Sequence, residues 1–99
     1  MKVKIQSLHF DADKKLLDFV HEKVNKLETY YDKIINGDVV LKINKSDAAE
    51  NKVAEIRLFI PGNDLFVKKQ CKSFEEAVDI AVEALRKQIT KHKEKANEQ

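Results

Sequence analysis

Hydrophobic residues recur every three or four positions in the last part of the chain, between Ser73 and Lys95. The positions are Phe74, Ala77, Val78, Ala81, Leu85 and Ile89. This spacing aligns them along one face of a helix. At its start, the Ser73 hydroxyl can accept a hydrogen bond from the backbone N–H of Glu76, whose carboxylate can reach back to the N–H of Ser73. The pattern therefore predicts a long amphipathic helix that begins at this capping box.

A second helical pattern lies nearer the N-terminus. Its hydrophobic positions are Leu16, Leu17, Val20, Val24, Leu27 and Tyr31. Asp13 precedes them and can cap the first turn, because its carboxylate can accept from a free backbone N–H. Asn36 and Gly37 follow, and glycine tolerates the left-handed conformation that often ends a helix. We expect this helix to begin after Asp13 and the segment to end at Asn36–Gly37.

Four stretches alternate between hydrophobic and polar residues with the period of a strand: Lys2–Leu8, Val39–Lys45, Val53–Ile60 and Leu65–Lys72. The side chains expected to face the core from the first three are Val3, Ile5, Val39, Leu41, Ile43, Ala54, Ile56, Leu58 and Ile60. Residues 46–52 and the Pro-Gly-Asn-Asp sequence at 61–64 predict turns. The lysines of the fourth strand suit a sheet edge, because charge discourages pairing with another chain.

The predicted element order is β-α-β-β-β-α. The first two strands are joined through a helix and can lie parallel, whereas short turns make the last three an antiparallel meander. Each helix has one hydrophobic stripe and the sheet has one strongly hydrophobic face, so both helices are expected on that face. This is a two-layer α+β fold with a four-stranded mixed sheet. We expect one domain over residues 1–95 and a frayed C-terminal tail over residues 96–99.

Composition describes a soluble, highly charged protein. The chain has 99 residues, of which 42% are hydrophobic and 36% charged. Its formal net charge is only +2, so any basic surface must come from local clustering. The chain has 1 cysteine, Cys71, which excludes an internal disulfide and favours a reducing compartment. The N-terminus lacks the hydrophobic run of a secretory signal, and we expect a cytoplasmic protein without a membrane span.

Cations cluster in the second half of the long helix. They are Arg86, Lys87, Lys91, Lys93 and Lys95, interrupted by one carboxylate at Glu94. The less specific interpretation is a solvated helix end whose charges suit the helix dipole. The alternative is a ridge that binds a polyanion, most plausibly RNA phosphates. If the helices lie side by side, Lys23 and Lys26 of the first helix would flank this ridge and complete one basic channel.

No catalytic set is visible in the sequence. His9, His21 and His92 are scattered without the spacing of a metal site or a catalytic triad, and Cys71 reads as a small core or edge residue. We therefore expect no cofactor, no metal and no enzymatic activity. Phe59 and Phe66 are predicted on the open face of the sheet, where they could stack bases. Isolated exposed aromatic residues are nevertheless common.

Three segments resemble one protein family. They are LRKQITKHKEK, preceded by FEEAVDIAVEAL, then KLETYYDKI at residues 26–34, and VVLKINK at residues 39–45. They resemble the last helix, the end of the first helix and the second strand of the ribosome hibernation-promoting factors. This is the ribosome-associated inhibitor family, whose members were formerly called sigma-54 modulation proteins. The similarity follows nearly the whole chain in order.

The resemblance implies a fold similar to double-stranded RNA-binding domains. It also implies binding to the small ribosomal subunit and its rRNA at the decoding region, in the channel for mRNA and tRNA. Occupation there would block translation and protect idle ribosomes in stationary phase or stress. The family's RNA-binding positions carried over to this sequence are Lys23, Lys26, Lys42, Lys45, Lys87, Gln88, Lys91, His92, Lys93 and Lys95. Arg86 is added from its place in the basic ridge.

The same resemblance sets expectations about partners. Long members have an extra C-terminal domain that brings two ribosomes together, and this chain ends at Gln99. Ribosome dimers would therefore require a separate dimerising factor; inactivation of single ribosomes is the alternative. We expect a monomer away from the ribosome, and neither DNA nor a membrane as partner. A competing hypothesis is a protein–protein adaptor of the sigma-factor modulation type, which would keep its partner after nuclease treatment.

Overall fold

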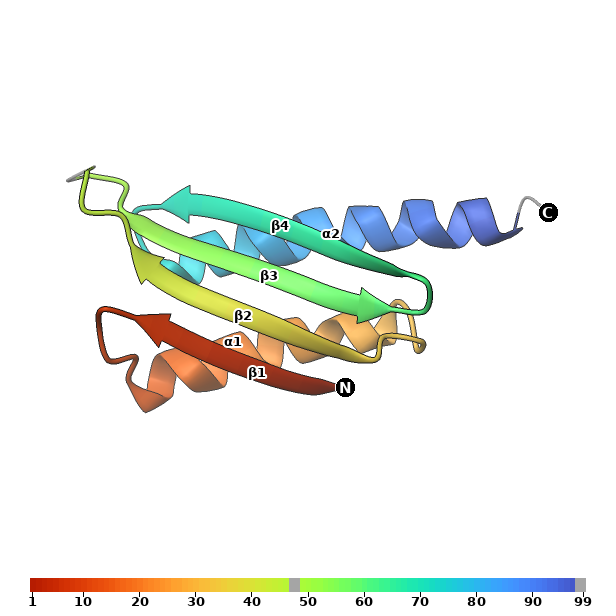
Figure 1. Cartoon of the computed structure of the whole chain (residues 1–99), viewed down its shortest axis with the longest axis horizontal. Coiled ribbons are helices and arrows are strands. Elements are labelled where there is room, and N and C mark those ends of the chain that lie inside the picture. The colour runs from red at the N-terminus through yellow and green to blue at the C-terminus, as the bar shows by residue number, and fades with distance from the viewer. Residues whose placement is uncertain (47–48, 98–99) are drawn as a thin grey trace.

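The structure is a computed structural model that describes residues 1–46 and 49–97. Its elements are β1 (Lys2–Leu8), α1 (Lys14–Asn25), the 3-10 helix η1 (Lys26–Thr29), β2 (Asn36–Ile43), β3 (Lys52–Ile60), β4 (Asn63–Cys71) and α2 (Phe74–Asn97). The predicted order β-α-β-β-β-α is confirmed (Figure 1). No helix in these ranges is both long and hydrophobic enough to cross a membrane.

The sheet has the order β1-β2-β3-β4, with β4 at one edge as predicted. β1 and β2 are parallel, with Ile5 opposite Val39, and the other two neighbouring pairs are antiparallel. Both helices lie behind the sheet in Figure 1 and run in the same direction. The predicted two-layer α+β fold is therefore confirmed, and it leaves one face of the sheet uncovered.

The core fills the space between the sheet and the two helices. Its fully buried side chains include Leu41, Ile56 and Leu58 from the sheet and Leu85 and Ile89 from α2. The residues expected to face inward from β3 are all buried, and so is the whole predicted stripe of α2. Burial of hydrophobic surface is the main force that holds two such layers together.

The side-chain acceptors predicted for both helix starts are confirmed, but the return bond from the Glu76 carboxylate to the N–H of Ser73 is not formed among the described residues. The backbone N–H of Leu16 donates to Oδ1 of Asp13 over 2.8 Å, and the N–H of Glu76 donates to Oγ of Ser73 over 3.1 Å. Each bond satisfies a backbone donor that the first helical turn leaves without a partner. The caps fix where α1 and α2 begin, and thereby the phase at which each hydrophobic stripe meets the sheet.

The predicted end of the first helical segment is wrong. α1 ends at Asn25 and continues only as η1, and Asn36 and Gly37 are the first residues of β2. Asn36 lies opposite Lys2 and opposite Phe59, so pairing with two strands determines its conformation. Gly37 is buried, and a Cβ atom there would lie 3.2 Å from Cδ2 of Leu58. A Cβ here would require the Leu58 side chain to shift, so glycine suits close packing between the layers rather than a left-handed turn.

The two turns of the meander lie near their predicted positions. β2 ends at Ile43, two residues before the predicted Lys45, and the turn prediction for residues 46–52 includes Asp47 and Ala48, which lie outside the described residues. Pro61 and Gly62 join β3 to β4, and Gly62 has a φ of 77°. Proline followed by a residue of positive φ is the signature of a type II turn.

The long axis of the molecule follows α2. The longest principal extent is 47 Å, and the last turns of α2 extend beyond the hairpin between β3 and β4 (Figure 1). α2 is helical through Asn97, and Glu98 and Gln99 lie outside the described residues, so the fraying expected at the C-terminus stays a prediction. The cation-rich half of α2 is thus the part that stands out from the rest of the fold.

Candidate nucleic-acid interface

The cations of α2 lie on two sides of its buried stripe. Because 100° separates successive helical residues, Arg86 and Lys93 fall on the side that faces α1 and η1, which we call the α1 flank. Lys87, Lys91 and Lys95 fall on the side above the edge of the sheet, which we call the β4 flank. The contacts of each side chain confirm this division.

The α1 flank is a series of contacts between the two helical segments. Nζ of Lys23 lies 3.1 Å from Oδ1 of Asp79. Further along, Nζ of Lys93 donates to the backbone carbonyl of Tyr30 over 2.9 Å, and the guanidinium of Arg86 lies 5.9 Å from the centre of the Tyr30 ring. Lys23 and Lys93 therefore have polar partners across the groove between the helical segments, and Arg86 lies against an aromatic ring there.

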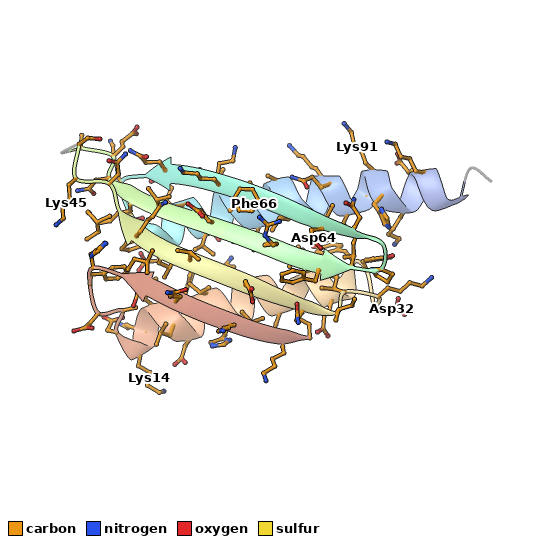
Figure 2. The ribbon with its side chains drawn as sticks, viewed as in Figure 1. Lys14, Asp32, Lys45, Asp64, Phe66 and Lys91 are labelled. Carbon is orange, nitrogen blue, oxygen red and sulfur yellow. The ribbon has the colours of Figure 1, made fainter. Side chains whose placement is uncertain are left out.

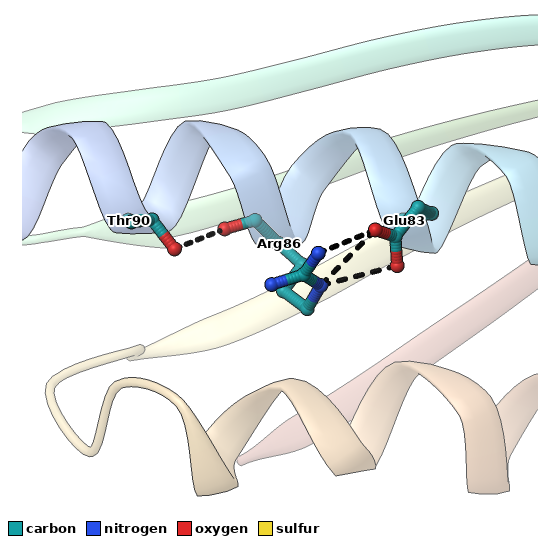
Figure 3. Close-up of polar contacts among 3 residues, drawn as sticks. All are labelled: Glu83, Arg86 and Thr90. Atoms are coloured by element: carbon teal, nitrogen blue, oxygen red, sulfur yellow. Dashed lines mark hydrogen bonds and ion pairs between the residues drawn. The ribbon is translucent and has the colours of Figure 1, made fainter.

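Arg86 is held in place by Glu83. Its Nε donates to both carboxylate oxygens over 3.1 and 3.2 Å, and its Nη2 donates to Oε1 over 2.5 Å (Figure 3). This hydrogen bonding lowers the pKa of Glu83 below that of an ordinary glutamate and raises the pKa of Arg86. Both groups are therefore charged at neutral pH, and the guanidinium keeps a fixed orientation on the helix.

The lysines of the β4 flank line open hollows and do not bridge two helical segments. One hollow of about 360 Å³ lies between Lys87 and Lys69 of β4, over Ile80 and Ala84, and the carboxylates of Asp79 and Glu83 also line it. A second, of about 240 Å³, is lined by Lys91 and Lys95 together with residues from the start of β4. Among the described residues, no carboxylate forms an ion pair with Lys87, Lys91 or Lys95. These three charges are exposed to solvent (Figure 2 labels Lys91).

The expected single basic channel is not formed. Lys23 pairs with Asp79 across the groove between the helices, whereas Lys87, Lys91 and Lys95 lie on the other side of the α2 stripe. The hydrophobic face of a helix against a sheet separates its two flanks, so a cation on one flank cannot line the groove on the other. Lys26 is exposed at the start of η1, beside the α1 flank.

Gln88 and His92 are half-buried and make contacts within the protein. Nε2 of Gln88 donates to the backbone carbonyl of Phe66 over 3.3 Å, which ties α2 to the outer edge of β4. The His92 ring meets Tyr31 edge to face, with centroids 5.5 Å apart. Both residues therefore help to position α2, in addition to whatever contact they make with a ligand.

Lys42 and Lys45 lie apart from the helical cations. Nζ of Lys42 is 2.7 Å from Oε2 of Glu55 in the neighbouring strand, on the uncovered face of the sheet. Lys45 is exposed after the end of β2, at the opposite end of the long axis from Lys91 (Figure 2). The structure does not bring these two lysines together with the cations of α2, and their RNA-binding role stays a prediction.

Sequence reasoning missed two residues of the interface. Lys69 occupies an inward-facing position of β4, between Val67 and Cys71, and its half-buried side chain reaches the hollow beside Lys87. A lysine at an inward position of an edge strand was the available signal, because its long stem can lie along hydrophobic surface while the amine stays in water. Tyr30 is the second missed residue, and its contact with α2 depends on tertiary structure alone.

The uncovered sheet face carries one exposed aromatic ring. Phe66 is 43% exposed, and the guanidinium of Arg57 lies 4.9 Å from its centre. Arg57 also lies 3.6 Å from Asp64. Phe59 is half-buried, and Cys71 is buried as predicted, where burial raises the pKa of its thiol.

Fold and site together define the class: a small α+β protein with a four-stranded mixed sheet and a last helix rich in unpaired cations. The family described as Sigma 54 modulation protein / S30EA ribosomal protein matches residues 3–97. The chain belongs to this family, and the resemblance found in the sequence is confirmed.

Several relatives are similar over nearly the whole chain. A ribosome hibernation promoting factor of Pseudomonas putida is 35% identical over 96% of this chain and 89% of its own length. One from Escherichia coli K12 is 30% identical, with 96% of both chains covered. A ribosome hibernation promotion factor of Bacillus subtilis is 31% identical, and here the match covers 98% of this chain but 51% of the relative.

Two solved structures share the fold. A ribosomal subunit interface protein from Coxiella burnetii superposes with a TM-score of 0.83 at 20% identity, covering 94% of this chain and 98% of the other. The N-terminal domain of Protein Y from Thermus thermophilus gives a TM-score of 0.79 at 26% identity, covering 93% and 99%.

Proposed function

We propose that this protein binds the small ribosomal subunit at its decoding region, through rRNA phosphates, and keeps cytoplasmic ribosomes inactive in stationary phase or stress. Membership of the family and the names of its relatives support the association with ribosomes. Occupation of the channel for mRNA and tRNA comes from the family resemblance and is part of the proposal.

The observation that carries the proposal is the β4 flank of α2. Lys87, Lys91 and Lys95 are exposed, and no described carboxylate pairs with them. In a chain whose net charge is only +2, three exposed lysines on one helix flank that form no ion pair with a described residue create a local positive field that attracts a polyanion. Lysine is a compact point charge without the geometry to read base edges, so these side chains are expected to bind phosphates.

Salt dependence tests this mode of binding. Replacement of Lys87, Lys91 and Lys95 by Gln keeps polarity and removes three charges. Each phosphate contact contributes about −0.7 to −0.9 to the slope of log K against log[salt], so the triple variant should flatten the slope by about two to three units. Affinity is measured with purified small subunits at several salt concentrations. The variant should also release inhibition of an in vitro translation reaction.

Lys2 and Lys4 provide the matched control. Both are exposed on β1, on the uncovered side of the sheet, and their replacement by Gln should change the slope much less. If the triple variant bound small subunits with the affinity and salt slope of the parent protein, the β4 flank would have no part in binding. Sedimentation of stationary-phase lysate with and without nuclease distinguishes the proposed function from the adaptor hypothesis, because an adaptor keeps its partner after RNA is digested.

A further inference from the structure

We propose that Tyr30 and Arg86 form a stacking site for one unpaired base of rRNA. The site lies at the end of the groove between the two helical segments, away from the lysines of the β4 flank. This inference rests on the proposed function and adds to it a contact that is not electrostatic. It gives the α1 flank a base-stacking role in addition to any phosphate contact made by its lysines.

Tyr30 presents an open aromatic face. It is 46% exposed, although it lies at the end of η1 and contacts Arg86 and Lys93 of α2. Hollows of about 440 and 320 Å³ lie next to it, and both are also lined by Lys93. A flat ring beside open space can accept a base on its face, which is how single-stranded RNA is most often held.

The platform is fixed before any ligand arrives. Glu83 accepts hydrogen bonds from Nε and Nη2 of Arg86, which favours the position of the guanidinium 5.9 Å from the centre of the Tyr30 ring. Lys93 anchors the backbone of Tyr30 through its carbonyl. Because Arg86 and the backbone of Tyr30 are already engaged by contacts within the protein, binding has less conformational entropy to lose.

The lysines around the ring suit a polyanion, and the exposed aromatic face favours RNA over an acidic protein surface. Lys26, Lys33 and Lys93 lie in the same region. Of the nearby carboxylates, Glu28 is paired with the ammonium group of Met1 and Glu83 with Arg86. The remaining carboxylates are Asp32 and Glu94. The three lysines supply phosphate contacts on either side of a stacked base, a combination typical of proteins that bind single strands.

Substitution of Tyr30 separates stacking from charge. Tyr30→Leu removes the aromatic face, and we expect affinity for purified small subunits to fall by about 5- to 100-fold, the range of one lost base–aromatic contact. The salt slope should stay unchanged, because stacking releases no counterions. Tyr30→Phe keeps the ring, and its affinity should stay within about twofold of the parent.

Phe66→Leu is the matched control. Phe66 is similarly exposed and also lies under an arginine, Arg57, but on the uncovered face of the sheet. The Phe66→Leu variant should bind small subunits with the affinity of the parent protein. A circular dichroism spectrum and a denaturation curve confirm that all three variants are folded, as expected for substitutions at exposed positions.

A single-stranded oligoribonucleotide with one 2-aminopurine gives a direct readout. The parent and Tyr30→Phe should quench its fluorescence by stacking, whereas Tyr30→Leu should not. If Tyr30→Leu binds small subunits as tightly as the parent protein, the stacking site is overturned. Loss of binding in the lysine triple variant would still support the proposed function in that case. If the parent protein fails to bind subunits, the proposed function falls, and absence of quenching then overturns the stacking site as well.

Discussion

Leu85 and Lys91 show how sharply residue roles differ within one helix. Leu85 has 0% of its surface exposed, whereas Lys91 is exposed on the β4 flank less than two turns further on. The first residue stabilises the packing of α2 on the sheet. The second is available to a ligand.

Leu85→Ala should lower the free energy of unfolding by about 2–5 kcal/mol, because it removes buried methyl groups and leaves a cavity. Lys91→Ala should change it by less than about 0.5 kcal/mol, as for most exposed side chains. Urea denaturation of both variants measures the difference. If Lys91→Ala proved the more damaging change, the assignment of helix faces would be wrong.

At the scale of elements, the start of α2 determines where its two flanks lie. Ser73 caps the first turn through Glu76, and the stripe that follows is buried from Phe74 to Ile89. Any loosening of the first turn would leave a backbone donor without its partner. The cap therefore contributes to stability without taking part in the interface.

Ser73→Ala should destabilise the protein by about 0.5–2 kcal/mol through loss of this cap. Ser73→Asp keeps an oxygen acceptor at the same position and should retain most of the stability, since a carboxylate also suits the positive end of the helix dipole. Thermal denaturation compares the two variants. Equal losses from both would show that the Ser73 side chain stabilises the fold by some contact other than the cap.

At the scale of the whole molecule, α2 separates two sets of cations. Arg86 and Lys93 face η1, while Lys87, Lys91 and Lys95 stand above the edge of the sheet. Glu83 and Glu94 are exposed between the two sets. A phosphate backbone that follows one flank must therefore cross the exposed face of α2, past these two carboxylates, to reach the other.

Charge removal on the two flanks should then have additive effects. Lys93→Gln should flatten the salt slope of subunit binding by about one unit, and the triple β4-flank variant by about two to three. Their combination should approach the sum, because distant sites with no shared partner act independently. Titrations at several salt concentrations measure all three slopes. A combined slope equal to that of the triple variant alone would place all the phosphate contacts on the β4 flank.

The sequence by itself determined the order of the elements, the residues that cap the two helices, and the side of β3 and α2 that is buried. Asp13 and Ser73 act as predicted, and β3 and α2 bury the predicted residues. These features are local: the period of the hydrophobic pattern and the chemistry of a cap depend on neighbours within about one or two turns. The family resemblance was likewise readable from consecutive residues.

Tertiary structure alone decided what lies beside each face. Gly37 looked like a helix end, yet it is a packing position because Leu58 comes within reach of its missing Cβ. Lys23 and Lys87 looked like neighbours, yet the buried stripe of α2 puts them on opposite flanks. No feature of the sequence singled out Tyr30, because its place beside Arg86 follows from the packing of η1 against α2. The period of the hydrophobic pattern indicates which face of an element is buried, but only the packing of distant segments determines which side chains meet.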